Sequence, residues 1–128
     1  MKKLIYLIVL ALVFLSCETK PKEGTALVSP QQFSQEIAMG TVQLVDVRTP
    51  EEFNNGHIKG AQNINLHDED FANQINKLHK DKTVYVYCKA GRRSAEATAT
   101  LKQNGFKNVV ELDGGTNAWS DAGQPLIK

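Results

Sequence analysis

The stretch that decides the fold is Thr83-Val84-Tyr85-Val86-Tyr87-Cys88-Lys89-Ala90-Gly91-Arg92-Arg93-Ser94. Its first five residues are β-branched or aromatic, which predicts a buried strand over 83–87. The sequence from 94 to 104 is rich in alanine and typical of a helix, and Gly105 suits its C-terminal cap. Cys88 and the basic residues after it therefore lie in a tight loop between a strand and a helix.

Outward from this stretch, segments typical of strands and of helices alternate along the chain. The predicted strands cover residues 42–47, 63–66, 83–87 and 108–112. The predicted helices begin after the capping residues Ser29 and Thr49 and cover 94–104 and 116–121, and Phe71, Ile75 and Leu78 lie at helical spacing. This alternation predicts an α/β domain with a parallel-rich sheet and helices on both faces. In such folds the site lies at the carboxyl ends of the strands, where Asp46, Cys88 and Asp113 fall.

The loop after the strand has the chemistry of an anion site. A glycine in a tight turn lets successive backbone N–H groups point inward, and the following helix directs its positive end to the same place. Lys89, Arg92 and Arg93 add three cations within five residues of the Cys88 sulfur. These features all favour a thiolate, so we expect a depressed pKa for Cys88 and a nucleophilic sulfur. The alternative is a buried, inert cysteine beside a solvated basic turn.

The first residues have the pattern of a bacterial lipoprotein signal. Lys2 and Lys3 precede an unbroken apolar run from Leu4 to Leu15, which is shorter than the ~20 residues of a membrane span. Ser16-Cys17 then resembles a lipoprotein cleavage site. We therefore expect a signal peptide over 1–16, a lipidated Cys17 with a tether over 17–25, and a folded domain over 26–128, held at the cell envelope. The alternative is an ordinary signal peptide with an incidental cysteine.

Composition limits the remaining function classes. Removing residues 1–16 takes away two of the 15 basic residues and none of the 14 acidic ones, which leaves a formal charge of −1. This balance does not indicate nucleic-acid binding. With Cys17 lipidated, Cys88 would be the only thiol, so no intrachain disulfide is expected. His67 and His79 have no neighbours typical of metal ligands, and we predict no metal, no cofactor and a monomer.

Three motifs resemble the signatures of single-domain rhodaneses, and together they span about residues 26 to 127. The first is the loop from Cys88 to Ser94, which resembles the active-site loop of that family. The upstream signature is matched by Asp46-Val47-Arg48, Glu52-Phe53, Gly56-His57-Ile58-Lys59-Gly60-Ala61 and Asn63-Ile64. The C-terminal signature is matched by Asp113-Gly114-Gly115, Ala118-Trp119 and Gly123-Gln124-Pro125-Leu126.

The resemblance implies a rhodanese-like three-layer domain with a central parallel sheet of about five strands. It also implies sulfur transfer through a persulfide on Cys88, from thiosulfate or a similar donor to a thiophilic acceptor such as cyanide, a small thiol or a protein thiol. Catalysis would be covalent, in two half-reactions. The residues that would hold the persulfide and the donor are those of the loop: Lys89, Ala90, Gly91, Arg92, Arg93 and Ser94.

Residues outside the loop are expected to support the site. Asp46 and Arg48 could polarise it, but we favour a structural ion pair that fixes the chain after the second strand. Glu51 and Glu52 are expected to complement the start of a helix. The resemblance makes His57 a structural loop residue, and Trp119 is expected in the core or in a pocket wall.

Two other functions remain open from the sequence. A cysteine phosphatase or arsenate reductase would typically place five residues between its cysteine and an arginine, whereas four separate Cys88 from Arg93. The shorter loop suits a persulfide or a sulfur oxyanion better than a phosphate ester. A persulfide carrier or binding module with a protein partner, without turnover of thiosulfate, is the non-enzymatic alternative.

Overall fold

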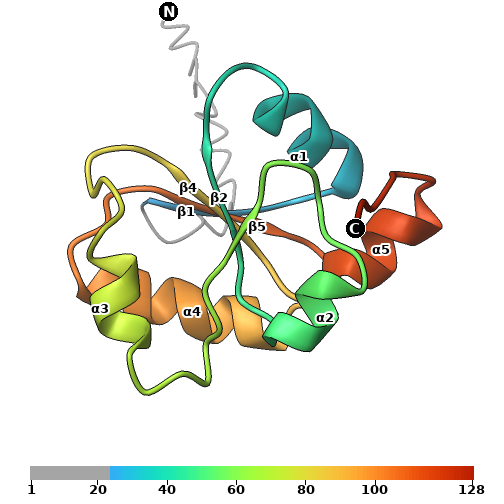
Figure 1. The fold of residues 1–128 in the computed structure, drawn as a ribbon. Helices are drawn as coiled ribbons and strands as arrows, with labels where there is room; N and C mark the ends of the chain where they lie inside the picture. The colour runs from blue at the N-terminus through green and yellow to red at the C-terminus, as the bar shows by residue number, and fades with distance from the viewer. Residues whose placement is uncertain (1–23) are drawn as a thin grey trace, which may run out of the picture.

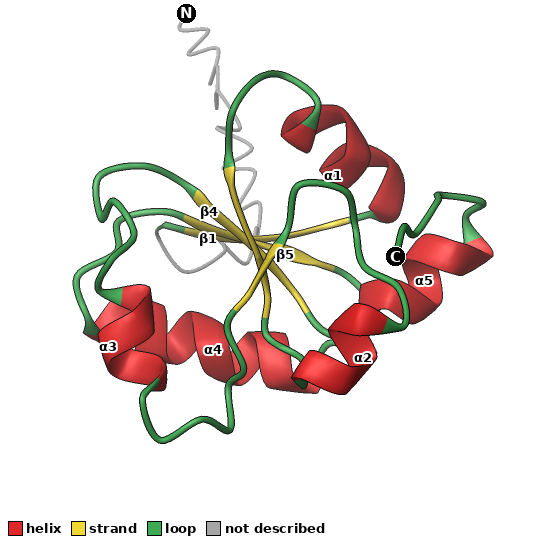
Figure 2. Ribbon diagram, in the orientation of Figure 1, coloured by secondary structure: helices red, strands yellow, loops and turns green. Residues whose placement is uncertain are grey.

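Residues 24–128 are described by a computed structural model in which strands and helices alternate along the chain (Figures 1 and 2). The strands are β1 (Thr25–Val28), β2 (Gln43–Asp46), β3 (Gln62–Asn63), β4 (Val84–Tyr87) and β5 (Val109–Leu112). The helices are α1 (Pro30–Ile37), α2 (Pro50–Asn54), α3 (Phe71–Ile75), α4 (Arg92–Gln103) and α5 (Gly115–Asp121).

The signal peptide predicted over 1–16 and the lipidation predicted at Cys17 lie outside the described residues. Within residues 24–128, no helix has the length and apolar character needed to span a membrane.

The five strands form one sheet in the order β1-β5-β4-β2-β3, and each neighbouring pair is parallel. From β2 the chain continues to β3, toward one edge of the sheet, whereas from β4 it continues to β5, toward the other edge. The carboxyl ends of β2 and β4 are therefore the point where the direction of winding changes, which is where open α/β sheets bind their ligands. Cys88 follows β4 directly and lies at this point.

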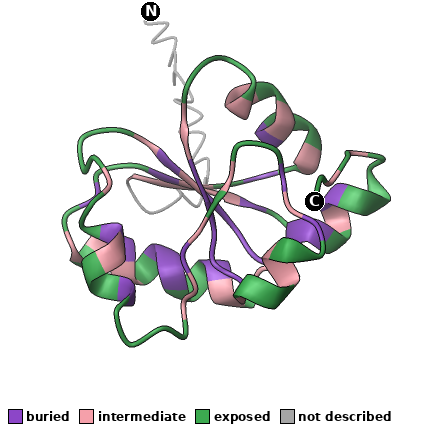
Figure 3. Cartoon of the chain, viewed as in Figure 1, coloured by how far each residue is buried: buried purple, intermediate pink, exposed green. Residues whose placement is uncertain are grey.

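Two apolar clusters cover the two faces of the sheet. One contains Phe71 and Ile75 of α3 and Leu101 of α4, packed on Val84 and Val86 of the central strand. The other contains Phe33 of α1 and Trp119 of α5, whose rings meet edge to face with centroids 6.2 Å apart. Figure 3 shows the buried positions concentrated on the strands and on the helix sides that face them. The three-layer α/β fold with a five-stranded parallel sheet is confirmed.

Most element boundaries shift by a residue or two from the sequence pattern, and three departures have a plain structural cause. The residue pattern alone did not indicate β1, an edge strand whose Leu27 is 62% exposed and whose ladder is formed with the distant β5. β3 has two residues instead of four, because it pairs only with the end of β2. α4 begins at Arg92 rather than at Ser94, since Gly91 adopts a left-handed conformation (φ 113°) and caps it.

A buried ion pair fixes the chain after β2. Asp46 is fully buried and Arg48 is 5% exposed, and the Arg48 Nη2 lies 2.6 Å from Asp46 Oδ2. Arg48 Nη2 also donates a hydrogen bond to the carbonyl of Gly56, which ends the α2 segment (2.7 Å). The guanidinium lies over the ring of Tyr87, 5.7 Å from its centroid. The pair therefore ties β2, β4 and the chain after α2 together.

Replacing one partner of this pair should destabilise the domain strongly. Arg48→Met leaves the Asp46 carboxylate buried without its counter-charge, and breaking a buried pair in this way costs about 3–5 kcal/mol. Urea denaturation should show that loss as a lower midpoint with an unchanged slope. The double variant Asp46→Asn/Arg48→Met removes both charges and should recover part of the loss. A single variant with the wild-type midpoint would contradict this structural role.

Candidate active site

The loop after β4 is held in place by the first turn of α5. The backbone N–H of Thr116 donates to the carbonyl of Cys88 (2.9 Å), and that of Asn117 donates to the carbonyl of Lys89 (3.0 Å). Gly115 allows this close approach, because a side chain there would collide with the same two carbonyl groups. Its φ of 58° is also a conformation that favours glycine. Gly115 of the C-terminal motif thus packs directly against the loop that carries the cysteine.

The sulfur of Cys88 is buried and accepts a hydrogen bond from the backbone. Cys88 is 1% exposed, and the N–H of Gly91 donates to Sγ over 3.0 Å. Ser94 Oγ lies 3.5 Å from Sγ and itself donates to the carbonyl of Gly91 over 3.1 Å. When Cys88 is a thiol it donates to Ser94, and when it is a thiolate the hydroxyl can rotate to donate to sulfur. The sulfur thus lies inside the turn that the α4 N-terminus closes.

These contacts lower the pKa of Cys88. Burial disfavours the charged form and on its own raises the pKa of the thiol. Hydrogen bonds from the Ser94 hydroxyl and from the backbone amides of Ser94, Gly91 and Ala90 act in the opposite direction and outweigh the burial. The cause of the lowered pKa is therefore mainly dipolar, from the turn and the start of α4, which agrees with the direction expected from the sequence.

The three cations of the loop have different environments. Lys89 and Arg92 are exposed to solvent, whereas the side chain of Arg93 is 23% exposed. Arg93 forms a bidentate ion pair with Glu52 of α2, with Nη1 to Oε1 at 2.7 Å and Nη2 to Oε2 at 3.0 Å. The hydrogen bond from Arg93 lowers the pKa of Glu52 to about 2, so the carboxylate is charged at neutral pH. Arg93, predicted to bind the donor, is already paired.

Sequence reasoning assigned Glu52 to the start of a helix and missed its contact with the loop. The structure shows both features, because Glu52 completes a capping box with Thr49 and also pairs with Arg93. The partners are 41 residues apart, so no local pattern could reveal the pair. The signal that was available is the position of Glu52 in the first turn of the helix that follows a strand end at the site.

The remaining residues singled out by sequence lie away from the sulfur chemistry. His57 stacks on Phe53, with centroids 3.8 Å apart, and its Nδ1 is 2.9 Å from the Phe53 carbonyl. Trp119 is buried and donates its indole N–H to the carbonyl of Pro125. Over residues 24–128, no group of three or more His, Cys, Asp or Glu side chains is arranged to hold a metal ion.

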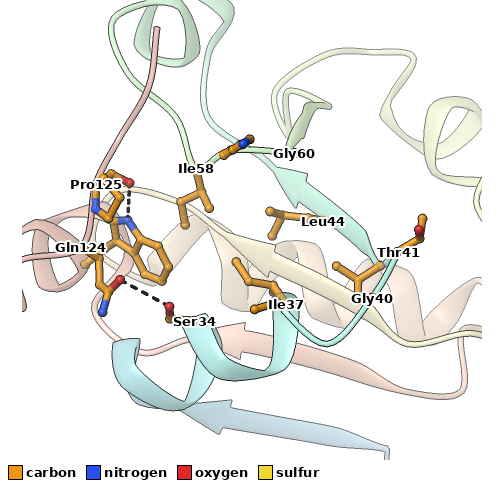
Figure 4. Close-up of a pocket in the computed structure, with 13 residues that line it drawn as sticks. Ser34, Ile37, Gly40, Thr41, Leu44, Ile58, Gly60, Gln124 and Pro125 are labelled. Carbon is orange, nitrogen blue, oxygen red and sulfur yellow. Dashed lines mark hydrogen bonds between the residues drawn. The ribbon is translucent and has the colours of Figure 1, made fainter.

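A hollow lies on the face of the sheet covered by α1 and α5 (Figure 4). It has a volume of about 480 Å³ and is bordered by Ile37 of α1, Leu44 of β2 and Ile58. A hydrogen bond from Ser34 to Gln124 crosses one side of it. None of the loop residues 88–94 lines this hollow, so it is separate from the cysteine site.

The chain matches the family model described as Rhodanese-like domain over residues 29–122. This match covers well over half of the chain, and the protein belongs to the rhodanese-like domain family. The matched segment contains Cys88, the whole loop after β4, and the Asp46–Arg48 and Glu52–Arg93 pairs.

Individual relatives agree with the family assignment. The protein YqhL of Bacillus subtilis is 44% identical over 77 residues, which are 60% of this chain and 60% of YqhL. The thiosulfate sulfurtransferase GlpE of Shewanella oneidensis is 40% identical over 95 residues, covering 74% of this chain and 92% of GlpE. A rhodanese-related protein from Thermoplasma volcanium superposes with a TM-score of 0.70 at 28% identity, covering 80% of this chain and 97% of that one.

Removing the Ser94 hydroxyl should raise the pKa of Cys88. Ser94→Ala deletes one donor to the thiolate and leaves the backbone amides in place. Below its pKa the sulfur is protonated and unreactive, so the wild type should react with iodoacetamide at pH values where the variant does not. The measurement is the pH profile of alkylation of the Cys88 peptide, followed by mass spectrometry. For the wild type its midpoint should lie below the ~8.5 of an ordinary cysteine, and for Ser94→Ala it should lie at a higher pH than for the wild type.

The matched control for this measurement is Ser120→Ala, which removes an exposed hydroxyl from α5. Its alkylation profile should coincide with that of the wild type. Coincident profiles for Ser94→Ala and Ser120→Ala would show that the hydroxyl has no part in stabilising the thiolate.

Proposed function

We propose that this protein is a sulfurtransferase that carries a sulfane sulfur on Cys88 as a persulfide. The observation that supports this most directly is a buried cysteine whose sulfur accepts the Gly91 N–H, in a turn that lowers the pKa of the thiol. Membership of the rhodanese-like domain family and the likeness to a thiosulfate sulfurtransferase support the same function.

In the first half-reaction the Cys88 thiolate attacks the outer sulfur of a donor such as thiosulfate. A bond forms between the two sulfur atoms, and the bond between the outer sulfur and the sulfonate breaks. Sulfite leaves with the bonding electron pair, and the protein retains one additional sulfur as a persulfide anion. No proton is transferred in this step, because the nucleophile is already a thiolate.

In the second half-reaction a thiophilic acceptor attacks the outer sulfur of the persulfide. Cyanide leaves as thiocyanate, or a thiolate leaves as its own persulfide, and the electron pair returns to Cys88. The backbone amides from Ala90 to Ser94 suit the persulfide anion, since preorganised N–H dipoles stabilise charge inside a buried turn. Gly91 is suited to this role because its left-handed conformation turns its N–H toward the sulfur.

Thiosulfate should add the mass of one sulfur atom to the protein, and cyanide should remove it. The adduct should map to the Cys88 peptide by mass spectrometry, and thiocyanate should form in the same reaction. Cys88→Ser should lose all turnover above the uncatalysed background, because the replacement lacks the sulfur nucleophile. Persistent turnover by Cys88→Ser would rule out this mechanism.

The same assay separates the two other functions. A carrier without turnover would accept one sulfur from a persulfide donor and release it only to a particular protein thiol, with no thiocyanate formed from thiosulfate. A cysteine phosphatase would instead hydrolyse a phosphate ester through Cys88 and gain no sulfur.

We further propose that the protein acts at the cell envelope, anchored by lipid on Cys17. This proposal is supported by Lys2-Lys3, the apolar run from Leu4 to Leu15, and Ser16-Cys17. Several acyl chains together anchor a protein stably, whereas one alone binds reversibly. The full chain expressed in bacteria should therefore fractionate with membranes and dissolve in detergent. Cys17→Ser should release it or leave the precursor uncleaved. A soluble wild-type product that begins at another residue would exclude the anchor.

A further inference from the structure

We propose that Glu52 determines which sulfur donors the site accepts. By holding Arg93 in a neutral ion pair, Glu52 disfavours dianionic donors such as thiosulfate relative to singly charged or neutral donors such as organic persulfides. This inference rests on the proposed sulfurtransferase function and makes Glu52 a positioning residue that acts through Arg93.

The carboxylate of Glu52 is fixed from two sides. Both of its oxygens accept hydrogen bonds from the terminal nitrogens of Arg93. Its Oε1 also accepts from the backbone N–H and the hydroxyl of Thr49, at 3.3 and 3.1 Å. In return, the Glu52 N–H donates to the Thr49 hydroxyl over 3.2 Å. Glu52 is therefore held by α2 as well as by Arg93, and its orientation does not depend on the ion pair alone.

The ion pair lies at the start of α4, the helix whose first turn contacts the sulfur. Arg93 is the second residue of α4 and directly precedes Ser94, whose hydroxyl contacts Cys88. The pKa of Arg93 is raised mainly by its hydrogen bond to Glu52, and the negative charge of Cys88 contributes in the same direction. In Figure 1, α2 lies alongside the start of α4, so that Glu52 reaches this region from a separate element.

Glu52 neutralises Arg93, which is the loop cation best placed to attract the second negative charge of a dianionic donor. Lys89 and Arg92 project into solvent, where water and salt weaken their effect on a bound anion. The partly buried Arg93 would act more strongly, but Glu52 carries the opposite charge within 3.0 Å of it. The amides of the turn can stabilise one negative charge on sulfur. A dianion must therefore either displace Glu52 or rely on the solvent-exposed Lys89 and Arg92 for its second charge.

The charge at the sulfur can be measured without any sulfur transfer. Iodoacetate and iodoacetamide alkylate the same thiolate, but iodoacetate carries one negative charge and iodoacetamide carries none. The iodoacetate rate divided by the iodoacetamide rate at Cys88 therefore reports the local electrostatic potential. Glu52→Gln keeps the oxygen that accepts from Thr49 and removes the carboxylate charge. In the full chain, this variant should raise the ratio by about three- to tenfold, the size expected for one charge at this range in a partly screened site.

Glu51→Gln is the matched control, because Glu51 is the neighbouring residue of α2, is exposed, and makes the same change in net charge. It should leave the ratio at its wild-type value. Arg93→Met tests the pair from the other side, since it leaves the Glu52 charge uncompensated and should lower the ratio. Iodoacetamide rates that match the wild type at a pH above the pKa of Cys88, where every variant is fully in the thiolate form, would show that each variant keeps its folded site.

Steady-state kinetics then connect the charge to donor choice. Glu52→Gln should lower the KM for thiosulfate and leave its kcat unchanged, while the KM for an organic persulfide should stay at the wild-type value. Equal alkylation ratios in the Glu52→Gln and Glu51→Gln variants would overturn the inference, as would an equal fall in KM for both donors. If no variant or wild type turned over thiosulfate, the thiosulfate mechanism would fail, and the alkylation ratio would still decide the role of Glu52.

Discussion

The ion pair between Asp46 and Arg48 is the interaction on which the geometry of the site depends. It is buried, it joins the end of β2 to the carbonyl of Gly56, and it lies against Tyr87 of the central strand. The hydroxyl of Tyr87 in turn accepts the N–H of Ile58, so the segment after α2 is fixed at two points. The helix α2 lies between the Asp46–Arg48 pair and these two fixed points. The carboxylate of Glu52, on α2, therefore meets Arg93 of α4 at a defined position.

The chemistry of the sulfur depends more on backbone dipoles than on the cations that the sequence displays. Three basic side chains follow Cys88, yet two are in solvent and the third is neutralised. The groups that lower the pKa of Cys88 are a hydroxyl and the amides of one turn, and their positions are set by hydrogen bonds from α5 to the loop carbonyls. Dipoles fixed by the fold need no reorganisation when charge develops on sulfur.

Local patterns in the sequence predicted the α/β class, the central strand, the loop, and the N-caps at Ser29 and Thr49, because each depends on neighbouring residues. They did not predict β1, which pairs with a strand more than eighty residues away. The contact between Glu52 and Arg93 was missed for the same reason, since it depends on how α2 packs beside α4. Asp46 and Arg48 could be paired from sequence because they are two residues apart.

The parallel order of the sheet separates the entry of the chain from the sulfur. Gly24 precedes β1 at the amino edge, where its carbonyl accepts the N–H of Val109, and Cys88 follows β4 at the opposite edge. A four-residue strand spans about 13 Å between these edges. Any attachment made through the residues before Gly24 would therefore be at the amino edge of the sheet. The loop that carries Cys88 lies at the opposite edge, on the side of the sheet away from such an attachment.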